Sequence, residues 1–144
     1  GNLTSPPMAV APLPQVRRVV EYALTEFYPN QLYLGIPNYG YNWTLPFREN
    51  SRAQSLNNVE AVRLAWNRRA AIRYDEQAQA PWFRYVDDRG GEHEVWFEDA
   101  RSIQAKLNLA FDYGLYGVGI WNLDRPFPQG WAVVNAMADI RSEM

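Results

Sequence analysis

Residues 31–43 read QLYLGIPNYGYNW and consist of two parts with different patterns. The first part, 31–37, is short and almost continuously apolar, which predicts a strand buried on both faces, as in a parallel sheet. The second part, 38–43, is predicted to be an aromatic loop at the carboxyl end of that strand. Ligands of α/β proteins bind at this end of the strands, so the loop is the first candidate binding site.

Helical patterns lie on both sides of this stretch. Apolar residues recur at helical spacing over 14–27 and again over 99–114, where Asp99 is the predicted cap and a glycine ends the helix. A second short apolar strand is predicted over 118–121. A last helix is expected to follow it, from about 130 to 141.

The middle of the chain, residues 44–98, is predicted to be a small α+β insertion. Asn57, followed three residues later by Glu60, has the pattern of a capping box and begins a helix that continues to about residue 69. Two aromatic runs, 82–86 and 93–97, flank a glycine-containing turn and predict an antiparallel hairpin.

Without the insertion, the predicted order is helix, strand, helix, strand, helix. Two parallel strands cannot close a sheet, and this order is that of the last quarter of a (β/α)8 barrel, which needs about 250 residues. The predicted fold class is α/β: a carboxyl-terminal fragment of a (β/α)8 TIM barrel, with its last two strands and helices and an inserted α+β domain. The predicted divisions are 1–43 and 99–144 for the barrel segments and 44–98 for the insertion. Because the chain starts at Gly1 rather than Met, we expect a processed chain or a piece of a longer one.

The composition excludes several classes of function. The 144 residues carry 14 basic and 16 acidic side chains, a net charge of −2, which argues against a nucleic-acid partner. No apolar run approaches about 18 residues, so no membrane span is predicted. The absence of cysteine excludes disulfides, and a single histidine, His93, excludes a multi-histidine metal site, so no metal or cofactor is expected. Aromatic residues reach 15%, enough rings to stack on sugars as well as to fill a core.

Three segments of the chain resemble family-18 glycoside hydrolases, the chitinase family. Residues 34–43, LGIPNYGYNW, are similar to the segment around the seventh strand of the family's barrel, and residues 117–121, GVGIW, to its eighth strand. VWFEDARS at 95–102, followed by Lys106, resembles the segment that leaves the family's insertion domain and enters its seventh helix. The resemblance covers about residues 8–141 and is closest to the bacterial spore-cortex and cell-wall members.

The same resemblance shows which catalytic parts are missing. The sequence contains no Asp-x-x-Asp-x-Asp-x-Glu run, which is the family's signature, and the family's strand-six tyrosine motif is absent as well. The resemblance implies substrate-assisted retaining hydrolysis, in which the acetamido oxygen of the sugar is the nucleophile and one protein carboxylic acid moves the proton. Since that acid is missing, no catalytic residue is assigned, and the chain alone is expected to be inactive.

The resemblance implies that Trp121 is the floor under the sugar at the cleaved position. Its indole offers a broad apolar face to the C–H groups of a sugar ring, although a tryptophan after a glycine-rich strand also fits a core. Tyr39, Tyr41, Asn42 and Trp43 are predicted to line sugar subsites, with packing of this loop against the insertion as the equal alternative. Close relatives carry Asp at the position of Asn42, whose amide can still donate and accept hydrogen bonds.

Polar residues near the end of the insertion have simpler interpretations than catalysis. Glu98 is the last candidate for substrate binding, and it is expected either to contact sugar from the insertion or to be solvated. Asp99 is expected to cap the following helix, whose dipole favours its charge. His93, in the predicted hairpin, is expected to be structural or exposed.

These observations predict the carboxyl-terminal segment of a glycoside hydrolase that acts on polymers containing N-acetylglucosamine, either spore-cortex peptidoglycan or chitin. Two alternatives remain: a non-catalytic carbohydrate-binding module, and a structural module of the spore or envelope. The family resemblance implies a secreted bacterial protein associated with the cell wall or the spore. The unpaired strand edges of a truncated barrel also predict self-association.

Overall fold

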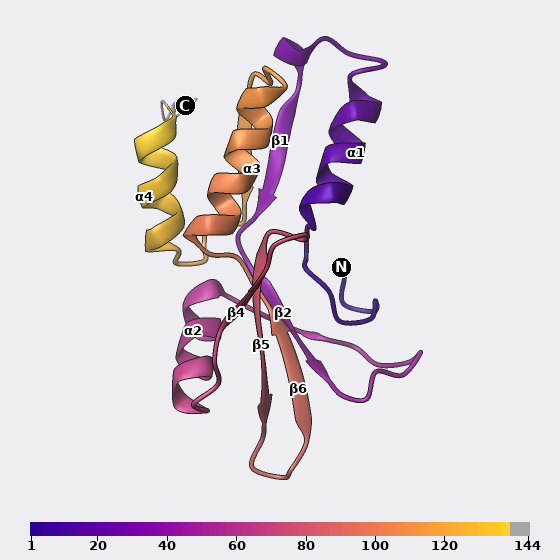
Figure 1. The fold of residues 1–144 in the computed structure, drawn as a ribbon, viewed down its shortest axis with the longest axis vertical. Coiled ribbons are helices and arrows are strands. Elements are labelled where there is room, and N and C mark those ends of the chain that lie inside the picture. The colour runs from indigo at the N-terminus through magenta and orange to yellow at the C-terminus, as the bar shows by residue number, and fades with distance from the viewer. Residues whose placement is uncertain (139–144) are drawn as a thin grey trace.

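The computed structural model describes residues 1–138, which form an α/β fold with two separate sheets (Figure 1). Strands β1 (Tyr33–Pro37) and β7 (Gly117–Trp121) form a parallel pair, as predicted. The second sheet is antiparallel and has the strand order β3-β2-β6-β5-β4. Its strands are β2 (Gly40–Thr44), β3 (Gln54–Leu56), β4 (Arg73–Asp75), β5 (Ala80–Val86) and β6 (Glu92–Trp96).

The helices divide between the two sheets. One helix packs on the five-stranded sheet and three pack around the parallel pair, at opposite ends of the molecule (Figure 1). Among residues 1–138, no helix has the length and apolar character needed to cross a membrane. The last part of the predicted final helix, 139–141, lies outside the described residues. The helices are α1 (Leu13–Ala23), α2 (Asn58–Asn67), α3 (Ala100–Asp112) and α4 (Pro128–Met137), and a short 3-10 turn (Pro29–Gln31) precedes β1.

The parallel pair is covered on one face only. Leu34 and Ile36 are buried against α3, with α1 and α4 beside it. On the other face Gly35 and, in register with it, Gly119 are exposed, and a side chain at either position would meet no atom within 4 Å. The prediction of a strand buried on both faces is therefore wrong within residues 1–138. The exposed residues of this open face are Tyr33, Gly35, Gly119 and Trp121.

The helix ends follow the predicted capping chemistry in α2 and α3. Asn57 and Glu60 form the capping box of α2, and Asp99 Oδ1 accepts from the backbone N–H of Ser102 at the start of α3. Gly114, with φ of +65°, ends α3 because this left-handed conformation lets the next N–H reach a carbonyl of the last turn. α1 ends earlier than predicted, at Ala23, where the turn that follows satisfies the last carbonyls.

The predicted aromatic loop over 38–43 is wrong beyond residue 39, since Gly40–Thr44 forms β2. The side chains of Tyr41 and Trp43 point to one face of this strand and that of Asn42 to the other, as in any pleated strand. The strand pairs with β6 and β3. Gly40 is required there because a Cβ would collide with the backbone of β6 at Trp96. The five-stranded sheet thus begins within the segment that the sequence assigns to the barrel, and the division at residue 44 remains a prediction.

Each face of the five-stranded sheet has its own cover. α2 packs Ala61 and Ala65 against Phe83 and Val95 on one face. The extended lead-in, residues 1–12, packs on the other face. There the indole N–H of Trp43 donates to the carbonyl oxygen of Ser5 at 2.8 Å. The lead-in is therefore part of the core of this sheet.

The predicted hairpin of β5 and β6 is confirmed, and His93 is at the centre of its polar contacts. His93 Nδ1 lies 3.0 Å from Asn42 Oδ1, and Nε2 lies 2.7 Å from Asp87 Oδ2 in the turn. The imidazole also stacks on Tyr85, with ring centroids 4.6 Å apart. The hydrogen bond from His93, aided by backbone N–H groups of the turn, lowers the pKa of Asp87 to about 2.

We expect acid to weaken this hairpin through Asp87. Because its pKa is lowered on folding, the carboxylate stabilises the fold above its ordinary value of 3.8, and this contribution is lost as the pH falls through about 2. Asp87→Asn should therefore flatten the dependence of the unfolding free energy on pH between about 4 and 2, measured by urea unfolding. Asp112→Asn, on an exposed helix end, is the control. Parallel pH profiles for wild type and Asp87→Asn would contradict the prediction.

Candidate functional site

Trp121 stands at the carboxyl end of β7, on the open face, and is 71% exposed. It is in register with Pro37, so the two parallel strands end at the same edge of their sheet. The peptide bond between Trp121 and Asn122 is cis. Within the described residues the indole does not fill a core, and it offers a wide apolar surface at the edge where α/β proteins bind ligands.

Two tyrosines follow β1 at the same edge. The guanidinium carbon of Arg125 lies 5.7 Å from the ring centroid of Tyr39, and the rings of Tyr39 and Tyr41 are 5.5 Å apart. Burial, with the neighbouring Tyr39 hydroxyl, raises the pKa of Tyr41 to about 12. The Tyr41 hydroxyl therefore stays protonated at neutral pH and serves as a hydrogen-bonding group rather than as a base.

Asn42 and Trp43 are not at this edge. Asn42 Nδ2 donates to the Tyr85 hydroxyl at 2.8 Å, and Asn42 Oδ1 faces His93, on the side of the sheet that α2 covers. Trp43 is 1% exposed and packs against the lead-in. Both side chains pack within the five-stranded sheet and its covers, because successive residues of β2 point to opposite covered faces. Packing of this segment, rather than lining of a sugar subsite, is the alternative that the sequence left open.

Glu98 is also buried, at 1% exposure, so the expectation of a solvated side chain is wrong. Its two carboxylate oxygens accept from Lys106 Nζ at 3.1 and 3.0 Å, and Lys106 is fully buried in α3. Burial raises the pKa of Glu98, and the ammonium group of Lys106 opposes the rise. The sequence indicates that Lys106 is buried, because it lies on the same helical face as the apolar Ile103 and Ala110.

No sequence pattern pointed to two buried asparagines, Asn38 and Asn58, as part of the site. Asn38 is fully buried and donates from Nδ2 to the carbonyl oxygens of Asn122 at 3.1 Å and Arg125 at 3.0 Å. Asn58, at the start of α2, donates to Asn38 Oδ1 at 3.2 Å. Their partners lie far away in the sequence, so only the position of Asn38 at the end of a strand hinted at a role.

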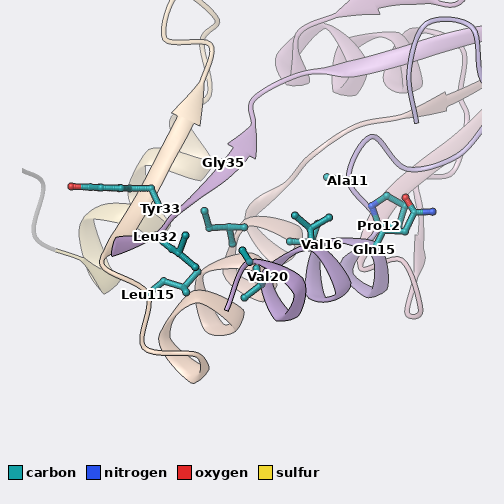
Figure 2. Close-up of a pocket in the computed structure, with 12 residues that line it drawn as sticks. Ala11, Pro12, Gln15, Val16, Val20, Leu32, Tyr33, Gly35 and Leu115 are labelled. Carbon is teal, nitrogen blue, oxygen red and sulfur yellow. The ribbon is translucent and has the colours of Figure 1, made fainter. Parts of the chain in front are cut away.

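Two cavities of the structure lie away from these residues. An apolar cavity of about 340 Å³ separates α1 from β1, where Val16 and Val20 face Leu32 and Leu115 (Figure 2). A second cavity, of about 620 Å³, has a charged rim formed by α1 and α3. Neither is lined by a predicted site residue, and no group of acidic or histidine side chains within residues 1–138 could hold a metal ion.

The fold and the site define an α/β protein with an exposed aromatic surface at the carboxyl ends of its parallel strands, the kind of surface on which sugar rings stack. Residues 5–125 match the family model "Glycosyl hydrolases family 18". The chain belongs to this family, as its sequence motifs predicted.

Individual relatives agree with this assignment. The chain is 47% identical over 136 residues to the cortical fragment-lytic enzyme of Bacillus subtilis, a match that covers 94% of this chain and 32% of that enzyme. It superimposes on the spore cortex-lytic enzyme SleL of Bacillus megaterium with a TM-score of 0.94 and 43% identity, covering 98% of this chain and 33% of the other. A chitinase of Chromobacterium violaceum matches with a TM-score of 0.84 and 29% identity, covering 92% of this chain and 40% of the chitinase. The chain spans about a third of the length of the two Bacillus relatives.

Proposed function

We propose that this chain forms the carboxyl-terminal part of the glycan groove of a family-18 glycosidase that acts on polymers containing N-acetylglucosamine. The observation that carries the proposal is Trp121, 71% exposed at the carboxyl end of β7. Tyr39, Tyr41 and Arg125 extend the same edge with aromatic and hydrogen-bonding groups. The similarity to cortical fragment-lytic enzymes favours spore-cortex peptidoglycan over chitin as the polymer.

We further propose that β1 and β7 are the last two strands of a (β/α)8 barrel. The parallel pairing, the helices on one face and the open face on the other support this, because a barrel interior is filled by side chains from all of its strands. Residues 44–98 are then the insertion, between barrel segments 1–43 and 99–144. Copies of a chain that lacks the other strands would associate through the same open face.

The chain contributes binding rather than proton transfer to the proposed reaction. In the complete enzyme, the acetamido oxygen of the sugar attacks the anomeric carbon while one carboxylic acid protonates the leaving oxygen. The two buried carboxylates among residues 1–138 are already engaged: Glu98 by Lys106, and Glu94 by Arg84 and Trp96 at 2.8 Å each. Trp121 supports the ring from below, and we propose no catalytic residue in this chain.

The same engaged carboxylates favour a second candidate, a carbohydrate-binding module without catalysis. It shares the Trp121 surface with the first proposal and differs from it in the activity of the complete protein. We propose a secreted protein at the spore or cell wall in either case, by analogy with the Bacillus relatives.

Calorimetric titration with N-acetylglucosamine hexamer tests the proposal. We expect the purified chain to bind this oligomer but not a glucose oligomer of equal length, which lacks the acetamido groups, and to release no reducing ends. Release of reducing ends by the chain alone would overturn the assignment of no catalytic residue. Failure of both the chain and the full-length natural protein to bind would leave a structural module of the spore or envelope.

A further inference from the structure

Asn38 holds the segment that follows Trp121. It comes directly after β1 and is fully buried. Its backbone N–H donates to the carbonyl oxygen of Trp121, and its side-chain Nδ2 donates to the carbonyl oxygens of Asn122 at 3.1 Å and Arg125 at 3.0 Å. Asn38 therefore holds both ends of the loop 122–125, which follows the proposed sugar floor, Trp121.

Asn58 continues this chain of hydrogen bonds into the insertion. It is the first residue of α2 and is 2% exposed. Its Nδ2 donates to Asn38 Oδ1 at 3.2 Å, and its Oδ1 accepts from the backbone N–H of Glu98 at 2.9 Å. The carboxylate of Glu98 is held by Lys106 in α3. The amide relay, Asn38 and Asn58, thus joins the ends of β1 and β7 to the starts of α2 and α3.

The direction of every bond in the amide relay is set by its outer partners. Backbone carbonyls only accept, so Asn38 turns its NH2 group toward Asn122 and Arg125 and its oxygen toward Asn58. The N–H of Glu98 only donates, so Asn58 turns its oxygen toward Glu98 and its NH2 group toward Asn38. Alanine and ionised aspartate cannot supply both a donor and an acceptor, which makes the two amides mutually dependent.

We propose that Asn58 positions the segment Trp121–Arg125, and through it the sugar floor, although its own side-chain hydrogen bonds are to Asn38 and Glu98. Loss of its NH2 group leaves Asn38 Oδ1 without a partner in a site closed to water. The cost of this unpaired oxygen favours movements of the Asn38 side chain that let its oxygen reach another donor, and such movements weaken the hydrogen bonds from Asn38 to the carbonyls of Asn122 and Arg125. The effect on sugar rests on the proposed function, whereas the effect on the segment does not.

The test compares Asn58→Ala with Asn57→Ala in the full-length natural protein that contains this chain. Asn57 is the adjacent residue and caps the same helix, accepting from the N–H of Glu60 at 2.8 Å, but it takes no part in the amide relay. We expect Asn58→Ala to weaken binding of N-acetylglucosamine hexamer about tenfold, and Asn57→Ala to change it less than about twofold. In a Trp121→Ala background, Asn58→Ala should have a clearly smaller effect, because the part of its effect that acts through Trp121 is already lost.

Hydrogen exchange read by mass spectrometry provides a measurement that needs no sugar. Asn58→Ala should speed exchange in the segment 121–125, and Asn57→Ala should not. Unchanged exchange in Asn58→Ala, equal effects of the two variants, or additivity with Trp121→Ala would overturn the inference. If the wild type binds no sugar, the proposed function fails and exchange alone decides the positioning role. If Asn58→Ala does not fold, Asn58→Ser, too short to reach both partners, is judged by the same criteria.

Discussion

Replacing Trp121 with alanine is expected to lower the affinity for N-acetylglucosamine hexamer about thirtyfold. A tryptophan that is covered by its ligand is among the side chains whose truncation costs about 2 kcal/mol or more, and this cost corresponds to about thirtyfold in affinity. Because Trp121 is 71% exposed without ligand, its removal opens no cavity in the fold. Affinity measured by calorimetry should therefore fall while the melting temperature stays unchanged.

Trp66 provides a matched control for this experiment. It is 84% exposed on α2, which packs on the five-stranded sheet and not on the parallel pair, so Trp66→Ala removes a similarly exposed indole elsewhere (Figure 1). We expect Trp66→Ala to bind as the wild type does, and Trp121→Phe, which keeps an aromatic face, to lie between wild type and Trp121→Ala. Equal losses in Trp66→Ala and Trp121→Ala, or no loss in either, would contradict the role of Trp121.

The parallel pair and the helix ends could be predicted because their signals are local. Strands β1 and β7 are short apolar runs bounded by turn residues, and the caps at Asn57 and Asp99 bond to groups only three residues away. The same reasoning placed Trp121 at the end of its strand. Its exposure could not be predicted, since that depends on which elements cover the open face.

Most of the errors concern contacts between residues that are distant in the sequence. Trp43 looked like a loop residue because its cover, the carbonyl of Ser5, comes from the lead-in, 38 positions away. For Glu98 the sequence left contact with sugar or solvation open, whereas its side chain is paired with Lys106, eight positions away inside the next helix. The Asn38 side chain donates hydrogen bonds to carbonyl oxygens 84 and 87 positions away, and no sequence periodicity predicts such contacts. Local patterns therefore located the edge of the sheet that carries the candidate site. The buried polar groups that support this edge could be identified only from the fold.

Replacing Lys106 with methionine is expected to destabilise the fold by about 3–5 kcal/mol at pH 7, because it leaves the Glu98 carboxylate buried without its cation. Burial already raises the pKa of Glu98, and loss of the ammonium group that opposes this rise lifts it further. The folded variant then holds a proton that the unfolded chain, with an ordinary value of 4.5, releases. Its stability therefore decreases as the pH rises above about 4.5, and urea unfolding at pH 5 and pH 7 measures the difference.

A second substitution separates the charge from the packing. In the Lys106→Met background, Glu98→Gln removes the buried charge, so it should restore most of the lost stability at pH 7 and abolish the added pH dependence. Arg101→Met is the control, since it breaks the exposed pair with Asp99, whose atoms lie 2.8 Å apart, and should cost about 1 kcal/mol or less. A loss in Lys106→Met no larger than that in Arg101→Met would mean that the buried pair does not stabilise the start of α3. A loss that is large but equal at pH 5 and pH 7 would assign the effect to packing of the lysine stem rather than to the uncompensated carboxylate.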